Sequence, residues 1–140
     1  GTTTGRPRRC GWLDLVVLRH ANRMNGFDGV TLTKLDVLGG IDELKICVGY
    51  TIDGEPCHEV PADIGRLAKC RPVYETVPGF PAYSLDKWLE IANRASSEGT
   101  GFVALPENAR NYVEKIEALS GIKIISVGVG PDRNATIERV

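Results

Sequence analysis

Hydroxyl-bearing residues and arginines crowd the first nine positions of the chain. The sequence GTTTGRPRR sets three threonines between two glycines and follows them with Arg6, Arg8 and Arg9. A guanidinium group offers two parallel donors to a carboxylate, and glycine lets backbone N–H groups approach a ligand closely. The segment 1–9 could therefore bind a small dicarboxylate or a phosphate. On composition alone, an exposed and solvated basic end of the chain is the competing interpretation.

A second candidate is the segment 33–36, Thr-Lys-Leu-Asp, which follows a predicted strand. Ligands of α/β proteins bind beyond the carboxyl ends of strands. The carboxylate of Asp36 could accept hydrogen bonds from N1–H and the 2-amino group of guanine, a donor pair that adenine lacks. The stem of Lys34 could cover the purine face. The segment resembles the NKxD guanine-recognition motif of GTPases, with Thr33 in place of Asn. An aspartate that caps the next short helix is the alternative.

A third candidate is the segment 126–133, Ser-Val-Gly-Val-Gly-Pro-Asp-Arg, where a strand runs into a glycine-rich loop. The backbone of such a loop can lie against a flat base, and a plain tight turn is the alternative. No GxxxxGK[ST] sequence occurs in the chain, so it contains no P-loop of that type. His20, His58 and Cys70 match no known zinc spacing, and we expect structural roles for them rather than a metal site.

Helix and strand patterns predict the elements that position these segments. Apolar residues three or four positions apart predict a largely buried helix over 12–25, and further helices over 84–95 and 106–120. Apolar and β-branched runs predict strands over 29–33, 45–51, 72–76 and 122–127, and a final edge strand over 136–140. A short helical turn is expected over 40–44, a turn at 53–54, irregular chain over the rest of 56–80, and a loop over 96–101. The alternation favours an α/β fold with a partly parallel sheet flanked by helices.

The bulk composition limits the class of protein. With 140 residues, 42% of them hydrophobic and 25% charged, the chain fits one compact globular domain. The formal net charge of −1 gives no global field that would attract nucleic acid or an anionic membrane. No apolar run approaches the roughly 20 residues of a membrane helix. Four cysteines without a CxxC pair favour a reducing, cytoplasmic setting.

Several stretches of the chain, taken in order, resemble the adenylosuccinate synthetase family in register. They are GTTTGRPRRCGW, LTKLDVL, KICVGY, YETVPG, LPENARNYVEKIE and GVGPDR, with variable stretches around 52–69 and 80–102. The resemblance implies that 1–140 is a single carboxy-terminal segment of a large P-loop-like α/β fold. It also implies a GTP-dependent ligase. Such enzymes phosphorylate the 6-oxygen of IMP, and the amine of L-aspartate then displaces the phosphate, with Mg²⁺ assisting.

Site residues follow from the resemblance position by position. The family's L-aspartate loop corresponds to Thr2, Thr3, Thr4, Gly5, Arg6, Pro7 and Arg8. Within it, Arg6 corresponds to a residue that also contacts IMP, and Arg8 to one that reaches GTP. The GTP-binding segments correspond to Lys34, Leu35 and Asp36, and to Gly128, Val129 and Gly130 in the loop 128–131. Many family members carry serine at the position of Gly128, so only backbone contacts are expected there.

The family's catalytic phosphate loop, a GDEGKG-like stretch that carries an Asp base, has no counterpart in these 140 residues. We therefore expect no catalytic residue in this segment, Mg²⁺ ligands in a missing amino-terminal part, and no ligation by the segment alone. The chain is expected to begin inside a longer protein, and the family is typically homodimeric. The alternative is a self-standing module that binds a guanine nucleotide without catalysis.

Overall fold

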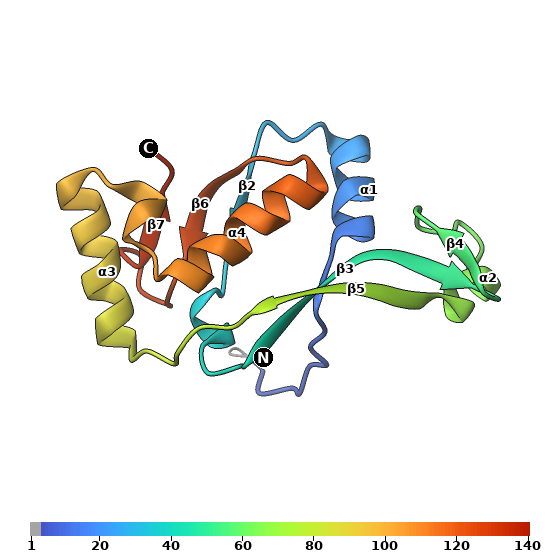
Figure 1. Ribbon diagram of the computed structural model, residues 1–140, viewed down its shortest axis with the longest axis horizontal. Coiled ribbons are helices and arrows are strands. Elements are labelled where there is room, and N and C mark those ends of the chain that lie inside the picture. The colour runs from blue at the N-terminus through green and yellow to red at the C-terminus, as the bar shows by residue number, and fades with distance from the viewer. Residues whose placement is uncertain (1–3) are drawn as a thin grey trace.

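The computed structural model describes residues 4–140, which form two sheets with helices packed against them (Figure 1). The strands are β1 (Leu13–Asp14), β2 (Val30–Leu32), β3 (Glu43–Ile52), β4 (Glu55–Cys57), β5 (Arg71–Pro78), β6 (Ile124–Gly128) and β7 (Thr136–Glu138). The α-helices are α1 (Leu15–Asn25), α2 (Ile64–Lys69), α3 (Leu85–Glu98) and α4 (Glu107–Ser120), and short 3₁₀ helices span Asp36–Leu38 and Gly101–Ala104. The fold is mixed α/β with parallel and antiparallel strands, which confirms the predicted class.

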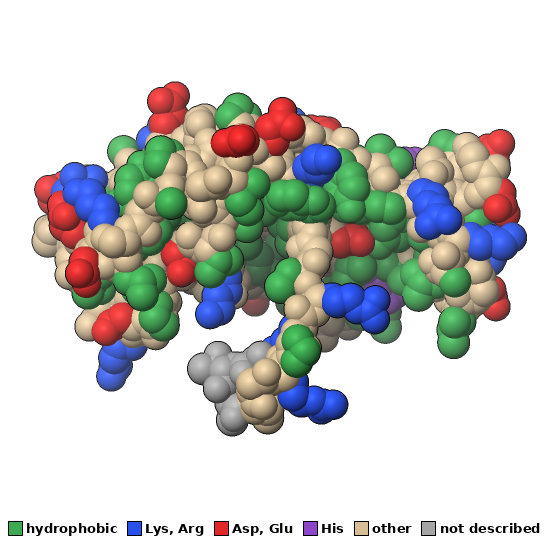
Figure 2. All heavy atoms as spheres, turned by 90° about the horizontal axis from the view of Figure 1, so that it is seen from below, with side chains coloured by type: hydrophobic (Ala, Val, Ile, Leu, Met, Phe, Trp, Pro, Cys, Tyr) green, Lys and Arg blue, Asp and Glu red, His purple; other side chains and the backbone are tan. Residues whose placement is uncertain are grey.

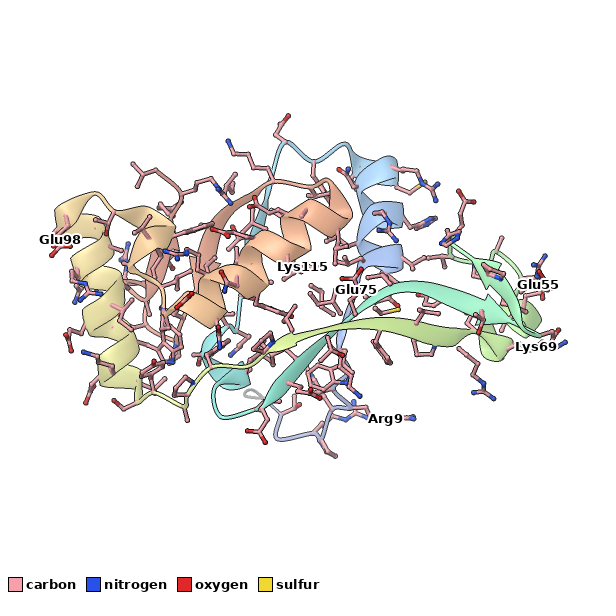
Figure 3. All side chains as sticks on the ribbon, viewed as in Figure 1. Arg9, Glu55, Lys69, Glu75, Glu98 and Lys115 are labelled. Atoms are coloured by element: carbon pink, nitrogen blue, oxygen red, sulfur yellow. The ribbon has the colours of Figure 1, made fainter. Side chains whose placement is uncertain are left out.

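The long strand β3 is the centre of the first sheet. It pairs in parallel with β1 and antiparallel with β4 and β5. β3, β4 and β5 form an arm that extends to the right in Figure 1 and carries α2 at its tip. A turn at Asp53 and Gly54, both with positive φ, closes β3 onto β4 and confirms the predicted turn. An ion pair of 2.7 Å between Lys115 and Glu75 ties the arm to α4 (Figure 3).

The second sheet joins β2 to β6 in parallel and adds β7 antiparallel at one side. The hydroxyls of Thr31 and Ser126 are hydrogen-bonded across the parallel pair, 2.7 Å apart, although 95 residues separate them in sequence. Because the two strands run in the same direction, their carboxyl ends, Leu32 and Gly128, lie at the same edge of the sheet. The loops that follow these strands are therefore neighbours, as a site at this edge requires.

Caps fix the ends of the main helices. Asp14 caps α1 and Ser84 caps α3, each by accepting hydrogen bonds from backbone N–H groups of the first turn. The three long helices all end on a glycine in the left-handed conformation: Gly26, Gly99 and Gly121. The capping residues and the terminal glycines are local signals. They allow the ends of these helices to be predicted from the sequence.

The main hydrophobic core lies where α3 and α4 pack on the sheets. Trp88 of α3 is fully buried, and it meets the rings of Phe80 and Tyr83 edge-on at centroid distances of 6.0 and 5.3 Å. Val113 of α4 and Ile124 of β6 are likewise fully buried in the same cluster. This packing holds the second sheet, and with it the ends of β2 and β6, in one rigid arrangement.

The helix predicted over 12–25 is wrong in its start and its burial. It begins at Leu15, because the two residues before it pair with β3 as β1 and because Asp14 caps the helix. Val17 and Met24 are 49% and 72% exposed, so the helix is buried along one face only. Periodicity alone could not show that Val17 and Met24 face away from the core of this chain.

Three further boundaries differ from prediction. The helical turn expected at 40–44 lies instead at Asp36–Leu38, because β3 already begins at Glu43. The helix expected to end near 95 continues to Glu98, since Gly99 is the first residue to leave it, and the loop expected over 96–101 is correspondingly short. The stretch 56–80 is more regular than expected and contains β4, α2 and the whole of β5.

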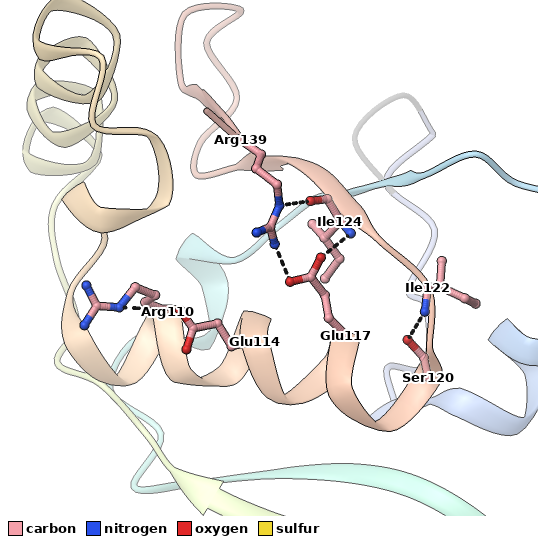
Figure 4. A network of polar contacts seen from close by, with 7 residues as sticks. All are labelled: Arg110, Glu114, Glu117, Ser120, Ile122, Ile124 and Arg139. Atoms are coloured by element: carbon pink, nitrogen blue, oxygen red, sulfur yellow. Dashed lines mark hydrogen bonds and ion pairs between the residues drawn. The ribbon is translucent and has the colours of Figure 1, made fainter.

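A half-buried polar network joins α4 to the second sheet (Figure 4). Glu117 accepts a hydrogen bond of 2.7 Å from the backbone N–H of Ile124 and forms an ion pair with Arg139. Arg139 also donates to the carbonyl oxygen of Ile124, at 2.8 Å, and its guanidinium carbon lies 4.7 Å from the ring centre of Phe102. One carboxylate thus connects the first residue of β6 to the chain just after β7.

We expect Glu117→Ala to lower the free energy of unfolding by about 2 kcal/mol, because it removes a charge-assisted hydrogen bond and leaves Arg139 without its carboxylate. Glu114→Ala, on the same helix, is the matched control. Its carboxylate lies 3.8 Å from Arg110 and is exposed, so about 0.5 kcal/mol or less is expected. Urea unfolding of both variants measures the difference, and equal losses would contradict the role given to Glu117.

Candidate functional site

The two predicted guanine segments lie together at the carboxyl edge of the second sheet. The backbone N–H of Leu35 donates to the carbonyl oxygen of Gly128 over 3.1 Å, so the segments 33–36 and 128–131 are joined directly. The side chain of Leu35 is buried in the main core, which anchors the segment from below. Lys34, one position earlier, is exposed and therefore free to lie over a ligand.

The backbone of this junction is strained at Lys34. Its φ of 66° lies in the left-handed region, which costs a residue with a side chain roughly 1 kcal/mol. The turn lets Leu35 enter the core and bond to Gly128 while Lys34 stays at the surface. Strain of this kind persists only where the surroundings impose it, and it is common at ligand sites.

Asp36 has a buried acceptor without a donor. Its Oδ1 atom is inaccessible to solvent and has no hydrogen-bond partner in the part of the chain that the structure describes. The alternative role, a cap for the short helix, does not hold, because Leu35 occupies the cap position and no side chain caps that helix. A buried acceptor left unpaired costs about 1–3 kcal/mol. Because the chain covers this atom, a ligand could donate to it only after the segment moved, whereas Asp36 as a whole is half-buried.

The loop that begins at Gly128 is held from below by a buried residue. Val129 is fully buried, and its N–H donates to the carbonyl oxygen of Ala135 over 2.8 Å. Asp132 closes the far side of the loop by accepting from the N–H groups of Asn134 and Ala135. These hydrogen bonds hold the loop in a defined conformation at the edge of the sheet. Its backbone could contact a ligand there through main-chain groups.

The arginine segment lies elsewhere. Gly1, Thr2 and Thr3 lie outside the described residues, and the residues from Thr4 to Gly11 are exposed irregular chain that leads into β1. β1 belongs to the first sheet, whereas the guanine segments belong to the second. Figure 2 shows the segment standing away from the body of the molecule, and Arg9 points outward in Figure 3. The prediction that Thr4, Gly5, Arg6, Pro7 and Arg8 form an aspartate loop therefore stays a prediction.

Other candidate groups contribute little to this edge of the sheet. Within residues 4–140, no three His, Cys, Asp or Glu side chains are grouped as metal ligands. A cavity of about 450 Å³ lies between β4 and α2, far along the arm, and is lined by Cys57, Asp63 and Arg66 among others.

Burial raises the pKa of the Cys47 thiol above its usual value, so this group stays protonated at neutral pH. No helix in the described range is long and apolar enough to cross a membrane.

Sequence reasoning missed one residue of interest, Asp14. Its Oδ1 accepts from the backbone N–H groups of Val16 and Val17 at 2.9 and 3.1 Å, and its Oδ2 accepts from the hydroxyl of Tyr50 at 2.5 Å. An aspartate followed by a run of apolar residues is a helix-start signal. That signal was available at Asp14, but the apolar periodicity across 12–25 obscured it.

Parallel strands whose following loops adjoin at their carboxyl ends form the kind of α/β edge at which ligands bind. A family model described as adenylosuccinate synthetase matches residues 1–137. The chain belongs to the adenylosuccinate synthetase family.

Individual relatives agree with this assignment. The chain is 51% identical to the adenylosuccinate synthetase of Desulfatibacillum aliphaticivorans over 140 residues, and 52% identical to that of Bacillus cereus over 136 residues. A solved structure of fully ligated adenylosuccinate synthetase from Plasmodium falciparum is 36% identical and matches all of the chain with a TM-score of 0.82. The chain spans about 30% of the length of these relatives: 30%, 29% and 31% respectively.

The space around Gly128 gives a testable contrast with Gly79. The three atoms nearest to a Cβ built on Gly128 all belong to Thr33, at 3.5 Å or more, whereas a Cβ on Gly79 would lie 1.7 Å from the carbonyl oxygen of Ile41. We expect Gly128→Ser to change the free energy of unfolding by less than about 1 kcal/mol, and Gly79→Ser to lower it by about 3 kcal/mol. Thermal unfolding of the two variants measures both values, and a large loss in Gly128→Ser would show that this edge has no room for a side chain.

Proposed function

We propose that this chain is the carboxy-terminal part of a GTP-dependent ligase that joins L-aspartate to IMP, with GTP converted to GDP and phosphate. In this role it recognises guanine through the segments 33–36 and 128–131 and contributes the arginine segment to the binding of aspartate. The observation that carries the proposal is the Leu35–Gly128 hydrogen bond, which joins the segment of the half-buried Asp36 to the loop 128–131 at one edge of the sheet. Family membership supplies the reaction.

Asp36 is the group that selects the base. A carboxylate only accepts hydrogen bonds, and guanine presents two adjacent donors, N1–H and the 2-amino group. Adenine presents an acceptor at N1 and would give the carboxylate of Asp36 no donor at that position. Lys34 is exposed next to this position, so its methylene stem can cover one face of the base. The backbone at Gly128 and Val129 then lies near the edge of the same ring.

Arg6 and Arg8 account for the acidic substrates. Aspartate brings two carboxylates and GTP brings phosphates, and a guanidinium can bind either with two parallel hydrogen bonds. In the proposed reaction Arg6 contacts both aspartate and IMP, while Arg8 reaches from aspartate to GTP. The threonines and Gly5 supply hydroxyl and backbone donors around the aspartate. No residue of this chain is assigned the transfer of a proton.

Mg²⁺ and the phosphate-binding loop belong to the remainder of the enzyme in this proposal. When bound, Mg²⁺ neutralises charge on the transferred phosphoryl group. The described residues contain no cluster of ligands suited to it, and no step assigned to this chain passes through it. We propose a small-molecule role for the chain in the cytoplasm, with IMP, L-aspartate and GTP as its partners, in an enzyme that is a homodimer.

A self-standing guanine-nucleotide module is the second candidate. It is favoured by the main hydrophobic core within residues 4–140, in which residues of β2 and β6 are packed together. Both candidates use Asp36 in the same way, and they differ in whether the rest of the ligase is needed for activity.

Calorimetric titration of the 140-residue chain tests the guanine site. We expect GDP to bind and ADP not to bind, and we expect Asp36→Ala to weaken GDP binding about 100-fold because two hydrogen bonds to a charged group are lost. Asp28→Ala, at an exposed aspartate before β2, is the matched control and should bind GDP as the wild type does. Equal binding of GDP and ADP would contradict the assignment of Asp36.

Asp36→Asn sharpens the same test. An amide offers one acceptor and one donor, which suits the N1–H and O2 of xanthine and opposes the 2-amino group of guanine. The variant should therefore prefer XDP over GDP, whereas the wild type prefers GDP. A variant that loses both nucleotides equally would indicate that Asp36 supports the loop rather than the base.

Activity separates the two candidates. We expect the 140-residue chain alone to form no adenylosuccinate from IMP, aspartate and GTP. We expect a chimera in which the chain replaces the matching part of the Bacillus cereus relative to form it, and to lose most activity with Asp36→Ala. Adenylosuccinate formation is followed by its absorbance. Activity of the 140-residue chain alone, or an inactive but folded chimera, would overturn this part of the proposal.

A further inference from the structure

An exposed leucine lies beside the glycine-rich loop of the candidate guanine site. A Cβ built on Gly130 would stand 3.9 Å from Cδ2 of Leu85, which is the first residue of α3. Leu85 is 55% exposed, whereas Val129, one position before Gly130, is fully buried. An apolar side chain is therefore present at the surface, next to the backbone that is proposed to lie near the base.

The exposure of Leu85 contrasts with the burial of the rest of its helix face. Leu85, Trp88 and Ala92 follow one another at steps of three and four positions, so they share one face of α3. Trp88 and Ala92 are 0% and 1% exposed and belong to the main core. The apolar face of α3 therefore continues beyond the core at the amino-terminal end of the helix, where more than half of Leu85 stays exposed.

The segment 80–85, which leads to this leucine, also contacts the chain just after Asp36. The backbone N–H of Gly40 donates to the carbonyl oxygen of Phe80 over 2.8 Å. A Cβ built on Gly40 would lie 3.3 Å from the Cβ of Ala82. The segment thus borders both candidate guanine segments, one at each of its ends.

We propose that Leu85 is a further binding residue of the guanine site, and that its side chain packs against the purine ring of the bound nucleotide. The inference rests on the proposed function, because it takes a guanine nucleotide to be the occupant of this edge. A purine has flat apolar faces besides its polar edge, and burying an exposed leucine against such a face is favourable. Asp36 then binds the polar edge of the base, and Leu85 supplies apolar contact that a carboxylate cannot.

Leu85 lies within the stretch 80–102, which the resemblance to the family leaves variable. Its assignment therefore depends on where the fold places it, beside Gly130, rather than on a shared motif.

Methyl NMR of the 140-residue chain, with isotope-labelled leucine methyl groups, tests the contact directly. The Leu85 signals are those missing from the spectrum of Leu85→Ala. We expect GDP to shift these signals upfield through the ring current of the purine, and to show a nuclear Overhauser effect from them to H8 of the base or H1′ of the ribose. The signals of Leu67, which is 43% exposed on α2 at the tip of the arm, are the control and should not move. If GDP binds only to the chimera with the Bacillus cereus relative, the same spectra are recorded on the chimera.

Kinetics of the chimera give a second readout. We expect Leu85→Ala to raise the KM for GTP about fivefold, because the contact of a few methyl groups is lost. The kcat and the KM for aspartate should each stay within about twofold. Leu85→Met keeps the apolar volume and should retain the KM for GTP of the wild type. Leu67→Ala is the matched control for loss of an exposed leucine and should change none of these values.

Leu85 signals that stay in place while GDP binds would overturn the proposal, as would an unchanged KM for GTP in Leu85→Ala. A raised KM without a methyl shift would also overturn it, because Leu85 would then support the loop at Gly130 rather than contact the base. If neither the chain nor the chimera binds GDP, the proposed function falls, and this proposal with it. If Asp36→Ala loses GDP while Leu85→Ala binds it as the wild type does, only the assignment of Leu85 falls.

Discussion

Parallel pairing of β2 with β6 is the constraint on which the candidate guanine site depends. It brings together segments 95 residues apart, and it forces both following loops to the same edge of the sheet. The hydrogen bond from Leu35 to Gly128 is a continuation of this pairing beyond the strands. Leu35 and Val129 are both buried in the main core, and their burial holds the two loops together at this edge of the sheet. Binding energy is then not spent on ordering the loops.

The first sheet has a different physical character. β3 and β5 form a long arm whose outer residues are exposed. Leu44 and Ile46 of β3 are buried in the main core and attach the arm to the body, together with polar contacts such as the ion pair of Lys115 with Glu75. The arginine segment leads into this sheet through β1, whereas the guanine segments follow strands of the second sheet. The main core joins the two sheets, because residues of β3 and β6 are buried in it together.

Local signals in the sequence were sufficient to predict the element boundaries that a capping residue or a turn residue marks. Ser84 marks the start of α3 and Gly121 the end of α4, and both were predicted closely, whereas the end of α3 was predicted near 95 although Gly99 marks it. The turn at 53–54 followed from Asp-Gly. The start of α1 was wrong, because apolar spacing continued across a residue that belongs to a strand. Strand pairing set that boundary, and pairing partners far away in sequence leave no local mark.

The same division applies to the site. The types of residue in 33–36 and 128–131 predicted two candidate loops, but only the fold shows that they adjoin and that Oδ1 of Asp36 has no donor. An unpaired buried acceptor lowers stability, and a strained Lys34 beside it adds to that cost. In the proposed function, adenine would set an acceptor against the carboxylate of Asp36 where guanine sets two donors. A site built to accept hydrogen bonds rejects the base that cannot donate them, because the carboxylate is then left without a partner.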